Sequence, residues 1–386
     1  MMAYRPQHLE CAHCRTVHDA RVLQNRCSCG GTLLARYELG GVGLDDLRGR
    51  GPGMWRYAEL LPTGDDVASL GEVETPLLPL PRFSERWGIG SLLKDDGTLP
   101  GGTFKARGAA VGLNRAVELG AQRIVMPSAG NAGGAWALYA ARAGIPVTVT
   151  MAKSAPAMNQ LEVEAAGAEL VLVDGTIADA GREAKRIASE TGAFLASTFN
   201  EPYRVEGKKT AWLETFDRLG DGRSMKLPGS IVVPVGGGVA AVAAAKAAAE
   251  VLGAGWATGP APVIFGVQSD RCAPIARAFE MGLTEVEPWD EDPETVAAGL
   301  RVPAPSEGDL VLHEVRASGG RMVTVPEGEI VGAVHDLASS EGIFACPEGA
   351  ATFLGAEYLA RQAALVEPVV IYNTGAGSKY ASFLAR

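Results

Sequence analysis

The sequence predicts an α/β protein built on parallel β-sheets, and three observations lead to that prediction. Short β-branched runs alternate with helical patterns along most of the 386 residues. The helical segments are rich in alanine and end at glycines such as Gly144, which is typical of helix C-termini. Glycine-rich turns stand where strand patterns end or helix patterns begin. Strands joined by helices need crossover connections, so we expect parallel strands covered on both faces.

The elements follow one another in a regular order. Each strand is predicted from a short run of Val, Ile, Leu or Phe, and each helix from apolar residues at helical spacing. The predicted strands are residues 123–131, 146–152, 168–175, 193–199, 230–238, 263–269 and 369–373. The predicted helices are residues 132–144, 177–192, 207–220 and 239–253. The repeated alternation indicates crossover units rather than hairpins.

The strand–helix units fall into two blocks, so we expect two parallel-sheet domains around a cleft. A small cysteine-rich segment is expected at residues 1–40, and a small α/β domain at residues 105–205. Residues 41–104 and 206–386 are expected to form a large domain together. Residues 284–309 are acidic and contain prolines, which indicates an excursion on the surface.

Composition excludes several classes of function. The chain is 47% hydrophobic and 21% charged, as in ordinary globular proteins, and its formal net charge is −10. An acidic body repels nucleic acid and anionic membranes, so we expect neither as a partner. The sequence has no run of about eighteen uncharged apolar residues, and its first residues do not resemble a secretion signal. We therefore expect a cytoplasmic protein with a small-molecule partner.

Four of the six cysteines crowd into "CAHCRTVHDARVLQNRCSCGG" near the N-terminus. Without a secretion signal, such spacing indicates metal ligation rather than disulfides. Cys11, Cys14, Cys27 and Cys29 are the candidate ligands of a structural zinc ion, because four thiolates satisfy its tetrahedral preference. The second pair is C-x-C instead of C-x-x-C, and reduced thiols without a metal are the alternative. The other two cysteines stand alone in apolar surroundings.

Lys105 is the strongest candidate for catalysis. It follows the glycine-rich turn "LPGGTF", and Thr103 is placed to cap a helix that begins at the lysine. A cation at a helix N-terminus opposes the macrodipole, which favours the neutral amine. A neutral lysine condenses with aldehydes, and the aldehyde cofactor that also carries a phosphate is pyridoxal phosphate. On its own, this segment is more typical of a solvated surface lysine than of a catalytic one.

Three further turns supply complementary groups. The "PVGGGVAAV" turn precedes a helix and suits a phosphate group, although it matches neither common nucleotide-binding pattern. Ser128 to Asn131 form a turn whose backbone N–H groups suit a carboxylate and whose amide suits a ring oxygen. Thr374 ends the strand "VVIYN" and offers a hydroxyl for a pyridine nitrogen. A neutral partner there favours elimination and replacement over transamination.

These segments, in this order, resemble the tryptophan-synthase-β family of pyridoxal phosphate enzymes, of fold type II. Within that family the chain is similar to the threonine synthases that carry an N-terminal cysteine knuckle. The resemblance extends from Cys11 to Lys379. It rests on "ETPLLPL", "KDDGTLPGGTFKARG", "SAGNAGGAWALYAARAGI", "EPYRVEGKKT", "PVGGGVAAV", "QSDRCAPIARAF", "EGIFACPEGAA" and "NTGAGSKY".

The resemblance implies roles for individual residues. Lys105 is expected to hold the cofactor covalently, to move protons and to be the catalytic residue. The expected cofactor-binding residues are Phe104, Lys105, Asn131, Gly236, Gly237, Gly238, Val239 and Thr374. The expected substrate-binding residues are Thr103, Ser128, Ala129, Gly130, Thr198, Asn200 and Arg204, with Arg204 beside the leaving phosphate. Lys208 and Lys209 are expected to be solvated helix residues.

The reaction implied is that of a lyase that converts O-phosphohomoserine and water to threonine and phosphate, by γ-elimination and β-addition, in a cytoplasmic homodimer. Two departures from the family's "NPTGSFK" leave alternatives open: Leu99 replaces a polar residue and Gly101 replaces a hydroxyl-bearing one. The alternatives are replacement of the phosphate of O-phosphoserine by sulfite to give cysteate, a related specialised-pathway replacement, and a serine or threonine dehydratase. A catalytically silent cofactor-binding regulator is the non-enzyme alternative.

Overall fold

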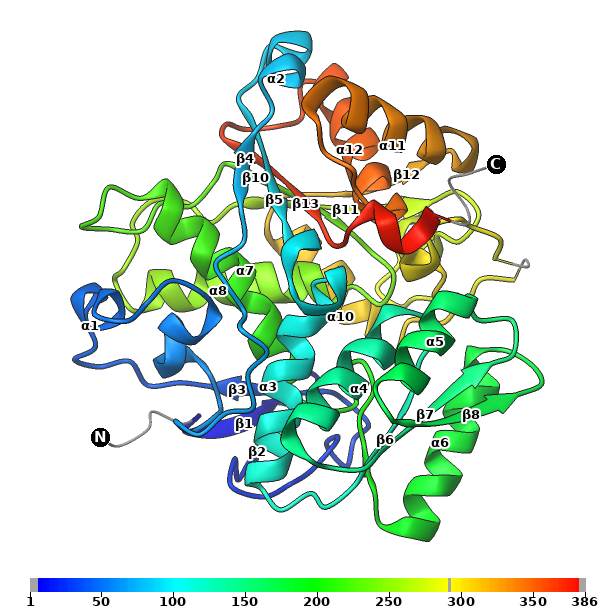
Figure 1. Ribbon diagram of the computed structural model, residues 1–386. Helices are drawn as coiled ribbons and strands as arrows, with labels where there is room; N and C mark the ends of the chain where they lie inside the picture. Colours follow the sequence, from blue (N-terminus) through cyan, green and yellow to red (C-terminus); the bar gives the residue numbers. More distant parts are fainter. Residues whose placement is uncertain (1–5, 291–292, 382–386) are drawn as a thin grey trace. The chain divides into compact units, whose positions relative to one another are not determined.

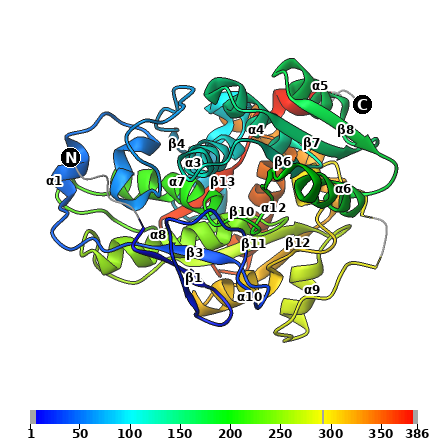
Figure 2. The same ribbon diagram turned by 90° about the horizontal axis from the view of Figure 1, so that it is seen from below.

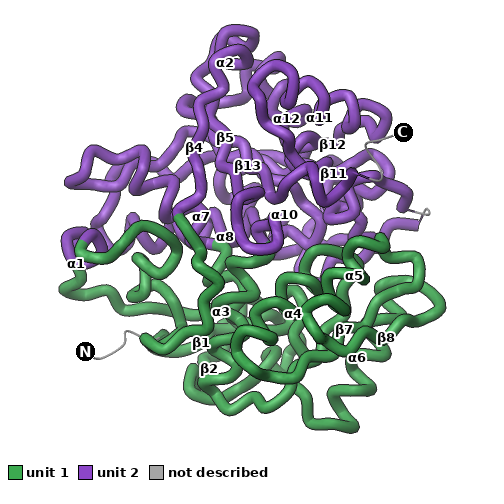
Figure 3. Tube along the Cα trace, in the orientation of Figure 1, with its two compact units in different colours: residues 1–42, 49–73, 105–208 green, residues 43–48, 74–104, 209–386 purple. Residues whose placement is uncertain are grey.

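The computed structural model describes residues 6–290 and 293–381 (Figure 1). The chain divides into two compact units, each assembled from separate stretches of sequence (Figure 3). Unit 1 comprises residues 1–42, 49–73 and 105–208, and unit 2 comprises residues 43–48, 74–104 and 209–386. Lys105 is the first residue of the third stretch of unit 1.

Unit 1 is built on a parallel sheet whose strand order is β8-β7-β6-β9. Its strands are β6 (Ile124–Pro127), β7 (Val147–Ala152), β8 (Glu169–Val173) and β9 (Phe194–Leu195). Helices α4 (Asn131–Ala143) and α5 (Ala157–Ala165) lie on one side of the sheet and α6 (Ile177–Thr191) on the other (Figure 2). The predicted parallel sheet covered on both faces is confirmed here.

Local sequence signals explain where these helices end. Helix α4 ends at Gly144, which adopts a left-handed conformation with φ 67°, a backbone angle that glycine reaches without strain. Helix α6 begins with a capping box, in which Thr176 and Asp179 each bond the other's backbone. Helix α3 (Lys105–Glu118) begins at Lys105, as predicted, and packs against α4.

The cysteine-rich segment forms a small antiparallel sheet of order β2-β1-β3, with β1 (His8–Cys11), β2 (Val17–His18) and β3 (Leu33–Arg36). It belongs to unit 1, as does the 3₁₀ helix η1 (Met54–Leu60). Asn25 donates a hydrogen bond to the carbonyl oxygen of Leu195 at 2.8 Å, and Arg115 of α3 donates one to the carbonyl of Ala20 at 2.6 Å. These bonds attach the segment to the rest of unit 1.

Unit 2 is built on a larger sheet of order β12-β11-β10-β13-β5-β4. Its strands are β4 (Leu77–Pro79), β5 (Ser91–Asp95), β10 (Ser230–Pro234), β11 (Val263–Ser269), β12 (Met322–Val325) and β13 (Val369–Asn373). All neighbouring pairs are parallel except β4 with β5. Strand β13, the last strand among the described residues, inserts between β10 and β5.

Helices cover this second sheet. Helix α12 (Pro347–Arg361) packs along β10 to β13 and beside α11 (Glu327–Glu341) (Figure 1). Helix α8 (Val239–Gly253) packs against β10 and β11, and α10 (Gly308–Ala317) packs against α8 and β11. Besides α7 (Arg204–Leu219), the described residues form the further helices α1 (Leu44–Arg48), α2 (Pro81–Trp87), α9 (Pro274–Glu280), η2 (Asp96–Thr98), η3 (Pro100–Gly102), η4 (Ala298–Leu300) and η5 (Gly377–Tyr380). The apolar faces meet in a core that includes Phe83, Val232, Phe265 and Phe353.

Strand β5, next to the edge strand β4, carries part of a fully buried polar cluster. The Nζ atom of Lys94 on β5 donates to Glu214 at 2.7 Å. Glu214 belongs to α7 (Arg204–Leu219), the helix in which the two units divide, between residues 208 and 209. Asp96 accepts hydrogen bonds from Thr75 and Tyr372. Each charge in the cluster has a partner, as burial requires.

Two details differ from the sequence prediction. The predicted strand at residues 193–199 is short, since β9 ends at Leu195 and a loop follows. The predicted surface excursion at residues 284–309 is wrong for part of its length, because Ala297 and Leu300 are fully buried in the core of unit 2. Residues 291–292 of that segment lie outside the described residues. In the described part of the chain, none of the helices has both the length and the apolar character needed to cross a bilayer.

Candidate functional site

Three loops leave the same edge of the unit 2 sheet. Strands β10, β13 and β5 are adjacent and parallel, with Val232 opposite Ile371 and Asn373 opposite Asp95. The loops that follow their carboxyl ends therefore start side by side, where ligands bind in open α/β sheets. They carry the glycine turn after Pro234, the turn at Thr374, and the segment that leads to Phe104.

The glycine turn has the properties of an anion cradle. A Cβ atom on Gly236 would lie 2.1 Å from the carbonyl oxygen of Gly299, and one on Gly238 would lie 2.1 Å from Val311. Gly238 also has φ 81°, so glycine is required there on two grounds. Helix α8 begins at Val239 and has no side-chain cap, which leaves its first N–H groups directed at the turn. A phosphate group fits such a helix N-terminus.

Thr374 and the residues before Lys105 are joined by backbone pairing. The amide of Phe104 donates to the carbonyl oxygen of Thr374 at 2.9 Å, and the Thr103 hydroxyl donates to the same oxygen at 3.2 Å. The Phe104 ring packs edge-on against Tyr372, with centroids 5.8 Å apart. Thr374 itself is almost buried, and its hydroxyl lies 3.6 Å from the Sγ atom of Cys346. The structure thus fixes Phe104 relative to Thr374.

The two departures from the family's lysine turn have local structural reasons. Leu99 is buried in unit 2. Gly101 has φ 69°, a conformation that a serine or threonine adopts only with strain, and its carbonyl oxygen accepts a hydrogen bond from Lys379 at 2.8 Å. Position 101 therefore suits glycine because of its backbone, whatever the substrate.

In unit 1, two loops leave one edge of the sheet in the same way. Strands β6 and β9 are parallel neighbours, with Val125 opposite Leu195. The loop after β6 holds Ser128, Ala129 and Gly130, and it ends at Asn131, the first residue of α4. The Ser128 hydroxyl donates to the carbonyl of Gly130 at 2.8 Å and accepts from two backbone amides, so it shapes this turn from within.

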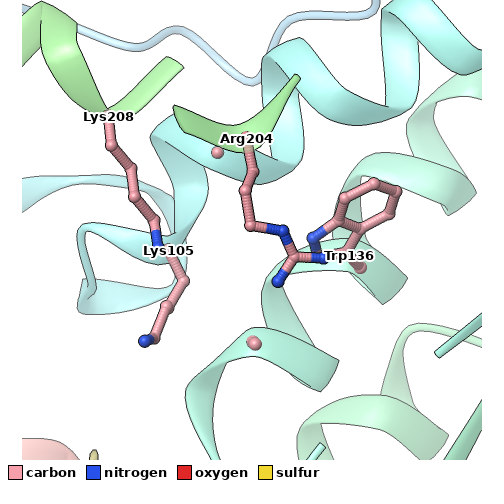
Figure 4. A pocket seen from close by; sticks show the side chains of 6 residues that line it. Lys105, Trp136, Arg204 and Lys208 are labelled. Atoms are coloured by element: carbon pink, nitrogen blue, oxygen red, sulfur yellow. The ribbon is translucent and has the colours of Figure 1, made fainter. Parts of the chain in front are cut away.

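A small pocket in unit 1 brings basic side chains from two helices together (Figure 4). It is lined by Lys105 and Gly108 of α3, Ala132 and Trp136 of α4, and Arg204 and Lys208 of α7. The guanidinium of Arg204 also lies over the Trp136 ring, 5.4 Å from its centroid. Three basic side chains lining one small pocket, one of them an arginine that keeps its charge, form a site for an anion.

Hydrogen bonds from two of its three nitrogen atoms fix the orientation of the Arg204 guanidinium. Its Nε atom donates to the carboxylate of Glu201, and its Nη1 atom donates to the Thr198 hydroxyl at 3.1 Å. The third nitrogen, Nη2, is buried and has no hydrogen-bond partner among the described residues. Burial raises the pKa of Glu201 above its ordinary value, and the Arg204 charge opposes that rise. A buried, unpartnered guanidinium nitrogen is costly without a ligand.

The expectation that Lys208 and Lys209 are solvated is wrong. Lys208 is only 4% exposed, and Lys209 is fully buried in an ion pair with Glu250. Lys208 lies one helical turn after Arg204, so both side chains project from the same face of α7. Gly108 makes room for them, since a Cβ atom there would lie 3.1 Å from Arg204 Cβ and 3.2 Å from Lys208 Cε. A glycine inside a predicted helix, here Gly108, is the sequence feature that could have indicated this close approach of α7 to α3.

Of the other residues predicted for the leaving group, Asn200 is used structurally. Its amide donates to the carbonyl of Leu195 at 3.0 Å, which holds the loop after β9. The Thr198 hydroxyl accepts a hydrogen bond from Arg204 at 3.1 Å, and Thr198 is not among the residues that line the pocket. Trp136 and Glu201 are residues of this site that the sequence analysis did not identify.

The four clustered cysteines meet in unit 1. Their sulfur atoms all lie within 4.8 Å of one another, with Cys11 and Cys29 at 3.4 Å and Cys14 and Cys27 at 3.6 Å. None of the four forms a disulfide. Zinc bound tetrahedrally by thiolates, with Zn–S near 2.3 Å, holds its sulfurs about 3.8 Å apart. A Cβ atom on Gly31 would lie 2.7 Å from Cys11 Sγ, so glycine is needed beside this cluster. The donor set fits zinc.

Comparison with known sequences is consistent with this geometry. The family described as pyridoxal-phosphate dependent enzyme matches residues 68–375. The chain is 34% identical over 377 residues to a threonine synthase of Methanosarcina acetivorans, covering 95% of this chain and 91% of that protein. It is 33% identical over 381 residues to a threonine synthase of Methanocaldococcus jannaschii, covering 96% and 92%.

Solved structures agree with the fold. Maize serine racemase superposes with a TM-score of 0.67 at 24% identity, covering 81% of this chain and 92% of that one. A threonine deaminase from T.th. gives a TM-score of 0.66 at 25% identity, covering 87% and 98%. The fold of both is the pyridoxal phosphate fold type II predicted from the sequence.

Proposed function

Because the chain belongs to the pyridoxal-phosphate dependent enzyme family, and is therefore an enzyme that uses this cofactor, we propose that it is a threonine synthase. The proposed reaction converts O-phosphohomoserine and water to threonine and phosphate. The observation that carries the proposal is the buried Arg204 Nη2 atom, which lacks a partner among the described residues and belongs to the pocket that Lys105 lines. The extended similarity to threonine synthases supports the same assignment.

Pyridoxal phosphate, once bound to an amino acid, would stabilise negative charge on the α-carbon and, through conjugation, make the β-carbon acidic as well. In unit 2, the turn at Gly236–Gly238 and the N-terminus of α8 would bind the phosphate of the cofactor, and the Thr374 hydroxyl would meet the pyridine nitrogen. In unit 1, Asn131 would contact the ring oxygen. Lys105 supplies the amine that joins the cofactor and carries protons between substrate carbons. Backbone amides of residues 128–130 bind the substrate carboxylate.

The leaving group in this reaction is a phosphate dianion, so its departure needs positive charge. Arg204 suits that role because its planar fork keeps its charge and its orientation is fixed by Glu201 and Thr198. A hydrogen bond from Nη2 to a phosphate oxygen would satisfy the remaining donor. Homodimer formation and a cytoplasmic location are part of the same proposal.

Product analysis tests this assignment directly. Incubation of the purified protein, loaded with cofactor, with O-phosphohomoserine is expected to release threonine and inorganic phosphate in equal amounts. A parallel incubation with O-phosphoserine and sulfite is expected to give no cysteate, and threonine or serine alone is expected to give no 2-oxo acid. Amino-acid analysis and a phosphate assay measure the outcomes. Cysteate as the only product would overturn the proposal.

We further propose that Cys11, Cys14, Cys27 and Cys29 hold a structural zinc ion. The segment is too short to build a core of its own, so the metal would supply its stability. Purified protein is expected to contain about one zinc per chain by elemental analysis. Cys27→Ser is expected to lower the metal content and the melting temperature, whereas Cys272→Ser, outside the cluster, is expected to keep the zinc. Full zinc content in the Cys27→Ser protein would contradict this assignment.

A further inference from the structure

Lys208 is a second buried amine in the pocket that Lys105 lines, and the roles proposed above leave it unused. Four observations place it there: it lines the pocket, it is 4% exposed, it lies one turn from Arg204, and Gly108 leaves space for its side chain. A lysine buried to this degree is rare in proteins, because an ammonium group loses its hydration there.

The charges around Lys208 favour its neutral form when the pocket holds no anion. Burial lowers the pKa of Lys208 well below its ordinary value, and the charge of Arg204 lowers it further. The charge of Lys105 adds to this effect only while its amine carries no cofactor. Glu201, on the loop before α7, is the carboxylate that opposes this shift, and it is itself paired with Arg204. Helix α4 contributes Ala132 and Trp136 to the pocket, and neither side chain titrates.

An anion in the pocket reverses this balance. A dianion beside Arg204 places two negative charges near Lys208, which favours the ammonium form strongly in a site of low dielectric. The ammonium then supplies N–H donors that complement the Nη2 atom of Arg204, which has no partner among the described residues.

We propose that Lys208 couples anion binding to proton uptake: its amine is neutral in the empty pocket and takes up one proton from solvent when a phosphate-like dianion binds. The nitrogen lone pair accepts the proton, the dianion keeps its charge, and no other bond changes. This inference rests on the anion pocket of the proposed function. It adds that Lys208 carries one more proton when the pocket is occupied than when it is empty. Release of the leaving phosphate from the pocket then returns the proton.

The sign of the pH dependence follows from this linkage. Below the pKa of Lys208 in the empty pocket, the lysine is charged in both states and binding takes up no proton. Above that value and below the pKa in the occupied pocket, binding takes up one proton and the dissociation constant rises up to tenfold per pH unit. At still higher pH the lysine is neutral in both states, and the dependence ends.

Sulfate is the probe of choice, because it stays a dianion across the tested range and any proton taken up belongs to the protein. Calorimetric titration of the holoenzyme with sulfate, between about pH 6 and 9 in buffers of different ionisation enthalpy, yields both the dissociation constant and the proton uptake. Wild-type protein is expected to show uptake approaching one proton per sulfate within that range. Lys208→Arg, which stays charged, is expected to bind sulfate with no uptake and no pH dependence.

Two more variants complete the test. Lys208→Met keeps most of the side-chain volume and is expected to weaken sulfate binding at least about tenfold, with no proton uptake. Lys185→Met, at an exposed position of α6, is expected to behave as wild type. Circular dichroism and melting temperature verify that each variant is folded.

Absence of proton uptake in the wild-type protein overturns the inference, as does uptake that persists in Lys208→Arg. Sulfate binding of equal strength in all variants overturns it as well. None of these measurements involves turnover, so the proposed reaction is judged separately: a protein that forms no threonine but binds sulfate with Lys208-dependent proton uptake would refute the reaction alone.

Discussion

Replacing Lys105 by alanine is expected to abolish threonine formation, with a loss of at least about a thousandfold in kcat. The same change is expected to remove the visible absorbance of the covalently held cofactor, because the amine that joins it is missing. Lys105 is the first residue of α3, and its side chain lines the pocket with Arg204 and Lys208. An absorbance spectrum together with a product assay measures both effects.

A control is needed because a lost lysine can also perturb folding. Lys185→Ala, on the exposed face of α6, is expected to leave spectrum and turnover unchanged. The melting temperature of the Lys105→Ala apoprotein is expected to lie close to that of wild-type apoprotein. An unaltered visible band in Lys105→Ala would contradict the assignment, since another amine would then carry the cofactor.

The second large effect is expected at Arg204. Its removal deletes the charged donors proposed for the leaving phosphate, and charge-assisted hydrogen bonds of this kind contribute roughly 1.5–3 kcal/mol each. We therefore expect kcat/KM for O-phosphohomoserine to fall about 10²–10³-fold, or about 3–4 kcal/mol. Steady-state kinetics with the phosphorylated substrate measure this loss.

Arg204 is also paired with the buried Glu201, so removing the arginine alone leaves an uncompensated charge. The informative comparison is between the single variant Glu201→Gln and the double variant Glu201→Gln/Arg204→Met, because neither protein retains the carboxylate that pairs with Arg204. Norvaline, an amino acid without phosphate, is expected to bind both proteins with the same dissociation constant. The change that norvaline causes in the absorbance spectrum of the cofactor measures this binding. Equal kcat/KM values for the phosphorylated substrate in the two proteins would show that Arg204 does not bind the leaving group.

Sequence patterns predicted the α/β class, strands β6 to β11 and β13, and helices α3, α4, α6, α7 and α8, but not helices α5 and α9 to α12. They succeeded where a strand or helix carries its own signal, as in the glycine that ends α4 and the Val-rich run of β10. They did not reveal that β13 inserts between β10 and β5, because strand order depends on pairing between distant parts of the chain. Strand β5 itself was obscured by Lys94, whose charge is buried against Glu214.

The candidate site was predictable to a similar degree. Arg204 and the glycine turn follow from motifs that can be read in the sequence, and their roles remain proposals. Lys208 was missed because a lysine on a helix is ordinarily solvated, and only the packing of α7 against Gly108 buries it. The Asn200 amide and the Ser128 hydroxyl form hydrogen bonds within their own loops, which the sequence did not predict, and their roles toward the substrate stay predictions.

The most direct test of this account is reduction of the holoenzyme with borohydride, followed by peptide mapping. Reduction fixes the cofactor to whichever amine carries it, and mass spectrometry of the peptides then identifies that residue. We expect the adduct on Lys105 alone. An adduct on Lys208, the other amine lining the pocket, or on no lysine at all in protein freshly loaded with pyridoxal phosphate, would contradict the account.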